Sequence, residues 1–181
     1  LLHQQEKNHI TAYAAIPYAD ALDWFPKWLQ QLDMESNGKS VGRNGKKVRY
    51  SSPVVFGSAG SNAQHSYFQL FHQGPQIIPI DFIAVRKPMS DRPEAVAHHR
   101  ILLSNCLAQA QALAHGKKAD NPNDVYPGKR PSSLLLLPEL NAFYLGALLA
   151  LYENRTATLG ALWDINSFDQ PGVEYGKVLA K

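Results

Sequence analysis

The stretch IIPIDFIAV, residues 77–85, decides the fold class of this chain. It is apolar at almost every position, which is typical of a strand buried on both faces inside a parallel sheet. Three shorter apolar runs predict further strands, at residues 11–17, 53–56 and 132–137. The sequence therefore predicts a sheet in which residues 77–85 form an internal strand.

Segments with helical spacing separate these strands. Residues 20–33 place apolar side chains at intervals of three and four, and Pro26 is expected either in the first helical turn or at a kink. Similar patterns predict helices over residues 63–73, 94–115, 138–153 and 156–163, and a terminal helix that begins near Asp169. Alternating strands and helices predict an α/β fold, in which a mostly parallel sheet is covered by helices on both faces.

Composition narrows the class of protein. With 181 residues, 45% hydrophobic and 18% charged, residues 1–181 are expected to form a single domain with a substantial core. The net charge of +3 is scattered along the chain, which argues against nucleic-acid binding. No apolar run reaches the roughly 18–20 residues needed to span a bilayer. The lone Cys106 fits a reducing compartment, and we expect a cytoplasmic protein.

Gln31 and Glu35 are the first candidate site residues. They stand at i and i+4, so they should project from one face of a helix. Glu35 falls in the last helical turn, where unpaired carbonyls disfavour a charged carboxylate and make it a better proton acceptor. The alternative is an ordinary surface glutamate that precedes a glycine cap at Gly38.

His65 is the second candidate. It is predicted in the first turn of a helix that follows the small-residue loop 57–62. A helix N-terminus favours anions and a neutral imidazole, which can transfer protons. The alternative is a histidine that only caps the helix, because the loop matches no nucleotide-binding pattern.

The third candidates lie in the terminal stretch GALWDINSFDQPGVEYGKVLAK, residues 160–181. In a helix that begins near Asp169, Gln170 and Lys177 are seven residues apart and share a face. Lys177 could act as an acid, a base or a phosphate partner. It could also be a solvated lysine that pairs with Glu174.

Residues 160–177 resemble the C-terminal signature of the glucose-6-phosphate isomerase (phosphoglucose isomerase) family. Three further blocks resemble the same family in the same order, namely QQLDMESNGK at 30–39, GSNAQHSYFQLFHQG at 60–74 and HHRILLSNCLAQAQAL at 98–113. The resemblance implies a Rossmann-like three-layer αβα sandwich of the sugar-isomerase (SIS) type with a C-terminal helical arm. It also implies that residues 1–181 are the C-terminal domain of a longer enzyme, in keeping with a chain that starts without Met.

The resemblance assigns a role to each candidate. Glu35 falls on the family's base, which moves a proton between the first two carbons of the sugar, and Gln31 falls on a substrate contact. His65 falls on a histidine that helps to open the sugar ring and that the neighbouring subunit of a homodimer supplies. Lys177 falls on the lysine that assists ring opening, and Gln170 is expected to line the site. No metal or organic cofactor is required.

The implied reaction is the reversible isomerisation of glucose 6-phosphate to fructose 6-phosphate, in glycolysis and gluconeogenesis. The short loop 116–125 suggests a bacterial-type enzyme. The family's phosphate-binding loop and its enediolate-stabilising arginine lie upstream, so these 181 residues alone are expected to be inactive. The alternatives are a non-catalytic sugar-phosphate-binding module, against which the joint presence of Glu35, His65 and Lys177 counts, and a weaker one, an extracellular signalling role.

Overall fold

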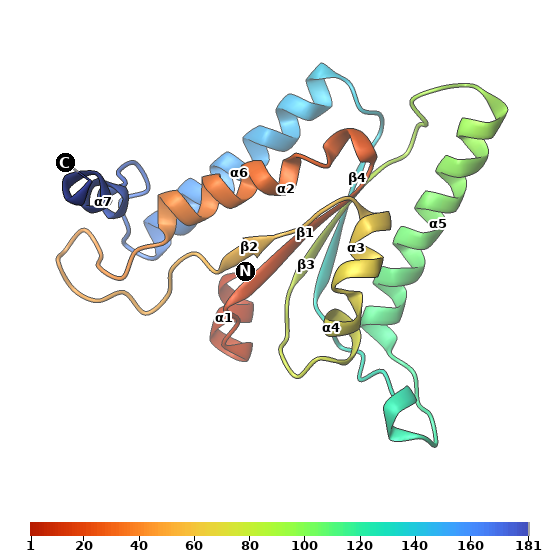
Figure 1. The fold of residues 1–181 in the computed structure, drawn as a ribbon, viewed down its shortest axis with the longest axis horizontal. Coiled ribbons are helices and arrows are strands. Elements are labelled where there is room, and N and C mark those ends of the chain that lie inside the picture. The colour runs from red at the N-terminus through yellow and green to blue at the C-terminus, as the bar shows by residue number, and fades with distance from the viewer. Residues whose placement is uncertain (181) are drawn as a thin grey trace.

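The computed structural model describes residues 1–180, which fold around a parallel four-stranded sheet (Figure 1). The strand order is β2-β1-β3-β4, and all three neighbouring pairs are parallel. The strands are β1 Ala12–Tyr18, β2 Val54–Phe56, β3 Ile80–Val85 and β4 Ser132–Leu137. The predicted α/β class is confirmed, and β3 is internal, as its sequence indicates.

Helices cover both faces of the sheet and make it the middle of three layers (Figure 1). The α-helices are α1 Leu2–Asn8, α2 Phe25–Gln30, α3 Gly60–Ser66, α4 Phe68–Gln73, α5 Pro93–His115, α6 Ala142–Leu162 and α7 Glu174–Leu179. Short 3₁₀ turns occupy Asp20–Leu22, Pro122–Asp124 and Pro171–Val173, and a π turn occupies Gln31–Glu35. Within residues 1–180, no helix is both long and apolar enough to cross a bilayer.

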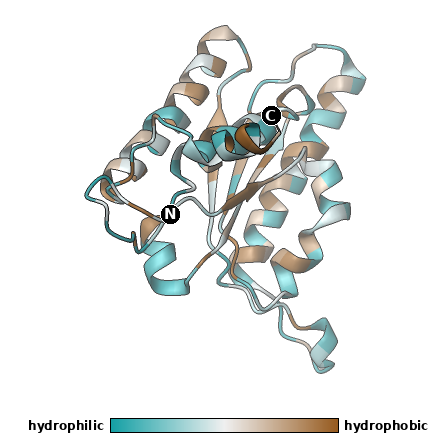
Figure 2. Ribbon diagram, turned by 60° about the vertical axis from the view of Figure 1, so that its left-hand side comes forward, coloured by the Kyte–Doolittle hydropathy of each residue, from teal (hydrophilic) through white to brown (hydrophobic). Residues whose placement is uncertain are grey.

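The alternation of side chains along the strands divides the core into two parts. Ile80, Phe82 and Ala84 of β3 pack with α3, α4 and α5 on one face, whereas Ile83 packs with α2 and α6 on the other. Figure 2 shows hydrophobic residues gathered along the strands, whereas hydrophobic and hydrophilic residues are mixed along the helices. The sandwich predicted from strand–helix alternation is thus built on the two faces of β3.

The prediction of two helices over residues 138–153 and 156–163 is wrong, because α6 runs unbroken from Ala142 to Leu162. The residues between the two predicted helices include neither Gly nor Pro. Asn154 donates from its side chain to the Ala150 carbonyl at 2.7 Å, one turn earlier, which is compatible with helix. Because α6 is unbroken, Arg155 and Thr156 lie within the helix, and both contact the buried Asp33.

The predicted helix over residues 63–73 is split. α3 already begins at Gly60, and Tyr67 interrupts the helix with φ −145° and ψ 7°. The Tyr67 hydroxyl lies 2.6 Å from the Ser58 hydroxyl, and its ring packs edge-on against Phe56 and Phe71. These contacts hold Tyr67 out of helical geometry. His65 therefore lies in the last turn of α3 and not in the first turn of a helix.

The predicted terminal helix begins later than Asp169. Gln170 has φ −140° and ψ 60°, Pro171 opens a 3₁₀ turn, and α7 starts only at Glu174. Proline fixes its own φ and disfavours helical geometry in the residue before it, so Gln170 cannot continue a helix into Pro171. The prediction that Gln170 and Lys177 share a helix face is therefore wrong. α7 forms an arm beside the ends of α2 and α6 (Figure 1).

Candidate active site

Glu35 lies on a π turn that continues α2. A π turn closes i→i+5 hydrogen bonds in place of i→i+4, and such turns occur frequently at functional sites. The predicted α-helical pair of Gln31 and Glu35 is therefore a pair on a wider turn. Both side chains are exposed. The wider turn leaves Glu35 accessible on one side while the other side of the helix is buried.

The buried side of this helix is marked by a row at intervals of four: Phe25, Leu29, Asp33 and Asn37. Asp33 is the charged member of the row, and it accepts hydrogen bonds from Arg155 and Thr156 of α6. Its side chain is only 4% exposed, and burial raises the pKa of the Asp33 carboxyl above its ordinary value. The π turn is thus anchored from behind by an ion pair to α6.

The same arginine reaches the sheet. Arg155 donates to the Tyr13 hydroxyl at 2.8 Å and lies 3.7 Å from the carboxylate of Asp81. Asp81, the carboxylate in the apolar run of β3, accepts hydrogen bonds from Tyr13 and, at 2.8 Å, from Tyr152. Burial, and then the charge of Asp81, raise the pKa of Tyr13 well above its ordinary value. The network therefore connects the helix that carries Glu35 to β1 and β3.

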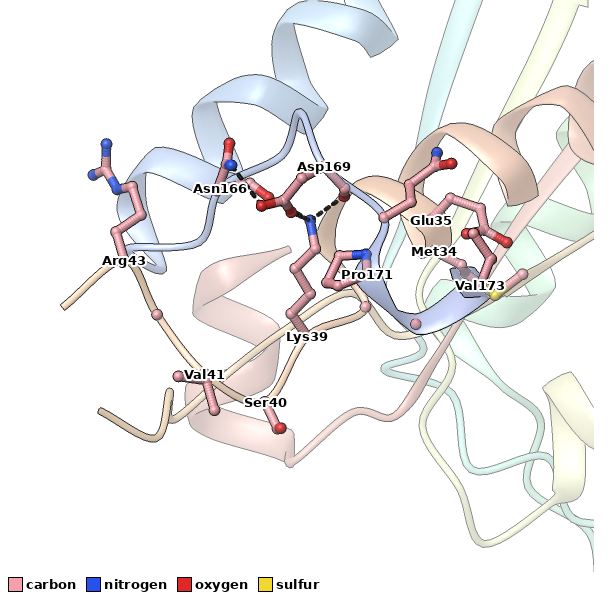
Figure 3. A pocket seen from close by; sticks show the side chains of 14 residues that line it. Met34, Glu35, Lys39, Ser40, Val41, Arg43, Asn166, Asp169, Pro171 and Val173 are labelled. Atoms are coloured by element: carbon pink, nitrogen blue, oxygen red, sulfur yellow. Dashed lines mark hydrogen bonds and ion pairs between the residues drawn. The ribbon is translucent and has the colours of Figure 1, made fainter. Parts of the chain in front are cut away.

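A pocket of about 820 Å³ opens next to Glu35 (Figure 3). One wall is the end of the α2 helix and the loop that follows it, from Met34 to Arg43, and the other is the loop from Asn166 to Val173. Glu35 and Gln170 line the pocket from opposite walls. The fold thus brings together two predicted site residues that stand far apart in the sequence.

The other predicted residues are not among those that line this pocket. Gln31 is exposed one turn before Glu35. Lys177 is exposed on α7, where its ammonium group binds the Glu174 carboxylate at 2.7 Å, the pairing that the sequence left open. His65 is exposed on α3, which packs on the opposite face of the sheet from α2.

The pocket lies at the amino-terminal edge of the sheet. The backbone NH of Ser52, two residues before β2, donates to the Asn37 carbonyl at 3.0 Å. The helix that follows β1 runs back along the sheet, so its end, with Glu35, reaches the edge where the strands begin. Ligands of doubly wound sheets usually bind at the opposite, carboxyl edge.

Three polar residues that the sequence analysis did not single out hold the two walls together. Lys39 donates to the carbonyls of Ser36, at 2.8 Å, and Asp169, at 2.7 Å, and to the carbonyl of Asn166. Asn37 donates to the Thr156 carbonyl at 2.8 Å and accepts from the Ser167 hydroxyl at 2.6 Å. Asp169 also binds Lys39 through its carboxylate, at 2.8 Å.

One of these residues carried a signal in the sequence. Asn37 continues the period-four row of buried side chains, which marks it as a polar group on an apolar face. Lys39 and Asp169 carry no comparable signal, because their contact joins segments that are remote in the chain. As for metals, no group of three His, Cys, Asp or Glu side chains that could hold an ion occurs in the described part of the chain.

The chain belongs to the phosphoglucose isomerase family, whose pattern it matches over residues 2–181. It is 51% identical over 178 residues to a protein of Cupriavidus pinatubonensis named glucose-6-phosphate isomerase 1, covering 91% of this chain and 32% of that protein. It is 49% identical to the glucose-6-phosphate isomerase of Dechloromonas aromatica, covering 92% of this chain and 34% of that one. The chain thus spans about a third of the length of these relatives.

Solved structures agree with the fold. A glucose-6-phosphate isomerase from Chlamydia trachomatis superposes with a TM-score of 0.87 at 41% identity, covering 99% of this chain and 36% of that one. A hypothetical protein from Thermus thermophilus superposes with a TM-score of 0.78 at 27% identity, covering 99% of this chain and 42% of that one. The family predicted from the sequence blocks is confirmed.

Proposed function

We propose that this chain is part of a glucose-6-phosphate isomerase, which interconverts glucose 6-phosphate and fructose 6-phosphate in glycolysis and gluconeogenesis. The observation that carries the proposal is the position of Glu35. Its carboxylate stands exposed at a pocket, on a turn whose opposite side is held by the ion pair between buried Asp33 and half-buried Arg155. An aldose–ketose isomerase needs a fixed, accessible base of this kind.

In the proposed mechanism, Glu35 removes the proton from the second carbon of the open-chain sugar and returns it to the first. The intermediate is a cis-enediolate, whose negative charge needs donors at its oxygens. Gln170, on the opposite wall, can offer its amide NH₂ to a sugar hydroxyl. His65 and Lys177 take part in opening the ring. The residues assigned to proton transfer need neither a metal nor an organic cofactor.

The assignment of His65 involves a second copy of the chain. α3 and α2 pack on opposite faces of the sheet, so His65 and Glu35 of one copy belong to different sides of the molecule. In the proposed homodimer, His65 of each copy completes the site of the other. The separation within one chain supports this arrangement over a site built by a single copy.

We further propose that residues 1–181 are the C-terminal domain of a longer enzyme, with residues 160–181 as its signature segment. The match to about a third of the relatives' length supports this division. Upstream residues would supply the phosphate-binding loop and the enediolate-stabilising arginine, so we expect the 181 residues alone to be inactive.

We place the enzyme in the cytoplasm, because a lone cysteine fits a reducing compartment. The lone thiol is buried, and burial raises the pKa of Cys106 to about 12, which makes it unreactive.

Substitution of Glu35 in the full-length enzyme tests the proposal. Glu35→Gln keeps the shape of the side chain and removes the base, so isomerase activity should fall by about 10²–10⁴-fold while sugar-phosphate binding persists. Glu6→Gln, at an exposed glutamate of α1, is the matched control and should leave the rate unchanged. A wild-type protein that binds sugar phosphates without turnover would favour the non-catalytic binding module instead.

A further inference from the structure

We infer that Lys39 is a positioning residue of the proposed isomerase site, which sets the distance between the wall that carries Glu35 and the wall that carries Gln170. This inference rests on the proposed function. The contacts of Lys39 with Ser36, Asn166 and Asp169 are called the Lys39 bridge below.

The Lys39 bridge joins the two walls of the pocket directly. On the first wall, the Lys39 ammonium binds the carbonyl of Ser36, the residue after Glu35, at 2.8 Å. On the second wall it binds the carbonyls of Asn166 and Asp169, the latter at 2.7 Å, and the Asp169 carboxylate at 2.8 Å. Figure 3 shows the Lys39 side chain extended toward the loop that holds Asn166 and Asp169.

The number of contacts argues against direct substrate binding by Lys39. A lysine ammonium has three donors, and the three carbonyls of the Lys39 bridge already take them. The side chain is only 16% exposed. A lysine in a pocket proposed for a sugar phosphate would ordinarily be interpreted as a phosphate ligand, but this one has no donor left for a phosphate.

A second lysine ion pair makes the contrast clear. The Lys87 ammonium lies 3.6 Å from the Glu139 carboxylate, with side chains that are 62% and 41% exposed. Exposed pairs of this kind contribute little to stability. Lys87 does not line the pocket of Glu35, so Lys87→Met is the matched control for Lys39→Met.

Two contacts of the Lys39 bridge fall on residues that are next to proposed site residues in the sequence. Ser36 follows Glu35, and Asp169 precedes Gln170, so loss of the Lys39 bridge frees both site residues to shift. Displacement of a catalytic group by about 1 Å can lower a rate by about 10²-fold. The Asn37 contacts to Thr156 and Ser167 remain without Lys39, so the fold itself should persist.

The experiment uses the full-length enzyme with Lys39→Met and Lys87→Met. A positioning role predicts that Lys39→Met lowers kcat by about 10–100-fold with little change in KM, and that Lys87→Met leaves both unchanged. A phosphate-binding role would instead raise KM at unchanged kcat, and that result would overturn the inference. So would wild-type kinetics in a folded Lys39→Met protein.

Hydrogen exchange provides a readout that does not depend on activity. Lys39→Met should increase amide exchange in residues 164–173 relative to both the wild type and Lys87→Met. Unchanged exchange there would refute the Lys39 bridge even if the wild type lacked isomerase activity. Absence of wild-type activity together with increased exchange would refute only the proposed function.

Discussion

The Asp33 carboxylate binds the Arg155 guanidinium on the buried side of the turn whose exposed side carries Glu35. Only Met34 stands between the structural carboxylate of Asp33 and the proposed base in the sequence. Because Arg155 also contacts Tyr13 and lies near Asp81, the position of Glu35 depends on the sheet as well as on its own helix. The four predictions below test this arrangement, the packing of the second wall and the proposed shared site.

Removal of Arg155 should destabilise the protein strongly. Arg155→Met would leave Asp33 buried and charged without a partner, which costs about 3–5 kcal/mol. The expected result is a clear fall in the thermal unfolding midpoint of the full-length protein at pH 7. Arg100→Met, at an exposed position of α5, is the control and should change the midpoint little. Equal midpoints for the two variants would contradict the role of Arg155.

The same variant should show a characteristic pH dependence. Burial already raises the pKa of Asp33, and loss of the arginine should raise it further. An acid with a raised folded-state pKa contributes stability below its unfolded value, about 3.9, and loses it as pH rises through the folded value. The stability difference between Arg155→Met and wild type should therefore shrink as pH falls from 7 toward about 4. A constant difference would show that Asp33 is not the destabilising group.

Two glycines of α6 should respond in opposite ways to alanine. A Cβ at Gly160 would lie 1.9 Å from the Ser167 hydroxyl and 2.7 Å from Oδ1 of Asn37, so it would push away the loop that forms the second wall. Gly160→Ala should destabilise by about 1–3 kcal/mol and lower activity. Gly146 has no described atom within 4 Å of a Cβ, and Gly146→Ala should stabilise by about 0.5–1 kcal/mol. Thermal unfolding of both variants checks this, and destabilisation by Gly146→Ala would contradict it.

The proposed shared site predicts recovery of activity in mixed dimers. Glu35→Gln and His65→Ala should each be nearly inactive alone, but a dimer with one copy of each holds one complete site. Co-expression with random pairing should restore about a quarter of wild-type activity. The control pairs Glu35→Gln with Lys177→Met, because Glu35 and Lys177 are assigned to the same copy, and it should restore none. Absence of recovery in the first mixture would show that His65 acts within its own chain.

Local sequence patterns predicted the strands well and the helix boundaries less well. The apolar run at residues 77–85 contains β3, because burial on both faces demands such composition. The run at residues 132–137 forms β4 at the edge of the sheet, where Leu134 and Leu136 are exposed. The break at Tyr67 was missed because it depends on contacts with Ser58, Phe56 and Phe71. Those contacts form only when the helix packs against the sheet.

The sequence predicted some residues of the candidate site and missed others. Glu35 and Gln170 were selected by spacing and by resemblance to a family, and the fold places both at one pocket. The roles of all five residues, including Gln31, His65 and Lys177, stay predictions. Asp33 was missed, although a carboxylate in a row with Phe25 and Leu29 on the apolar face of a helix is a signal that burial must be compensated.

The sequence by itself determined the α/β class, the internal position of β3 and the family, because hydrophobic periodicity and ordered motif blocks are local properties of the chain. Only the tertiary structure decided that Glu35 stands on a π turn at the amino edge of the sheet. It alone joined Lys39 to Asp169 and Arg155 to Asp33. Such contacts depend on how α2 and α6 pack on the sheet, and that packing optimises burial and polar pairing over the whole chain at once.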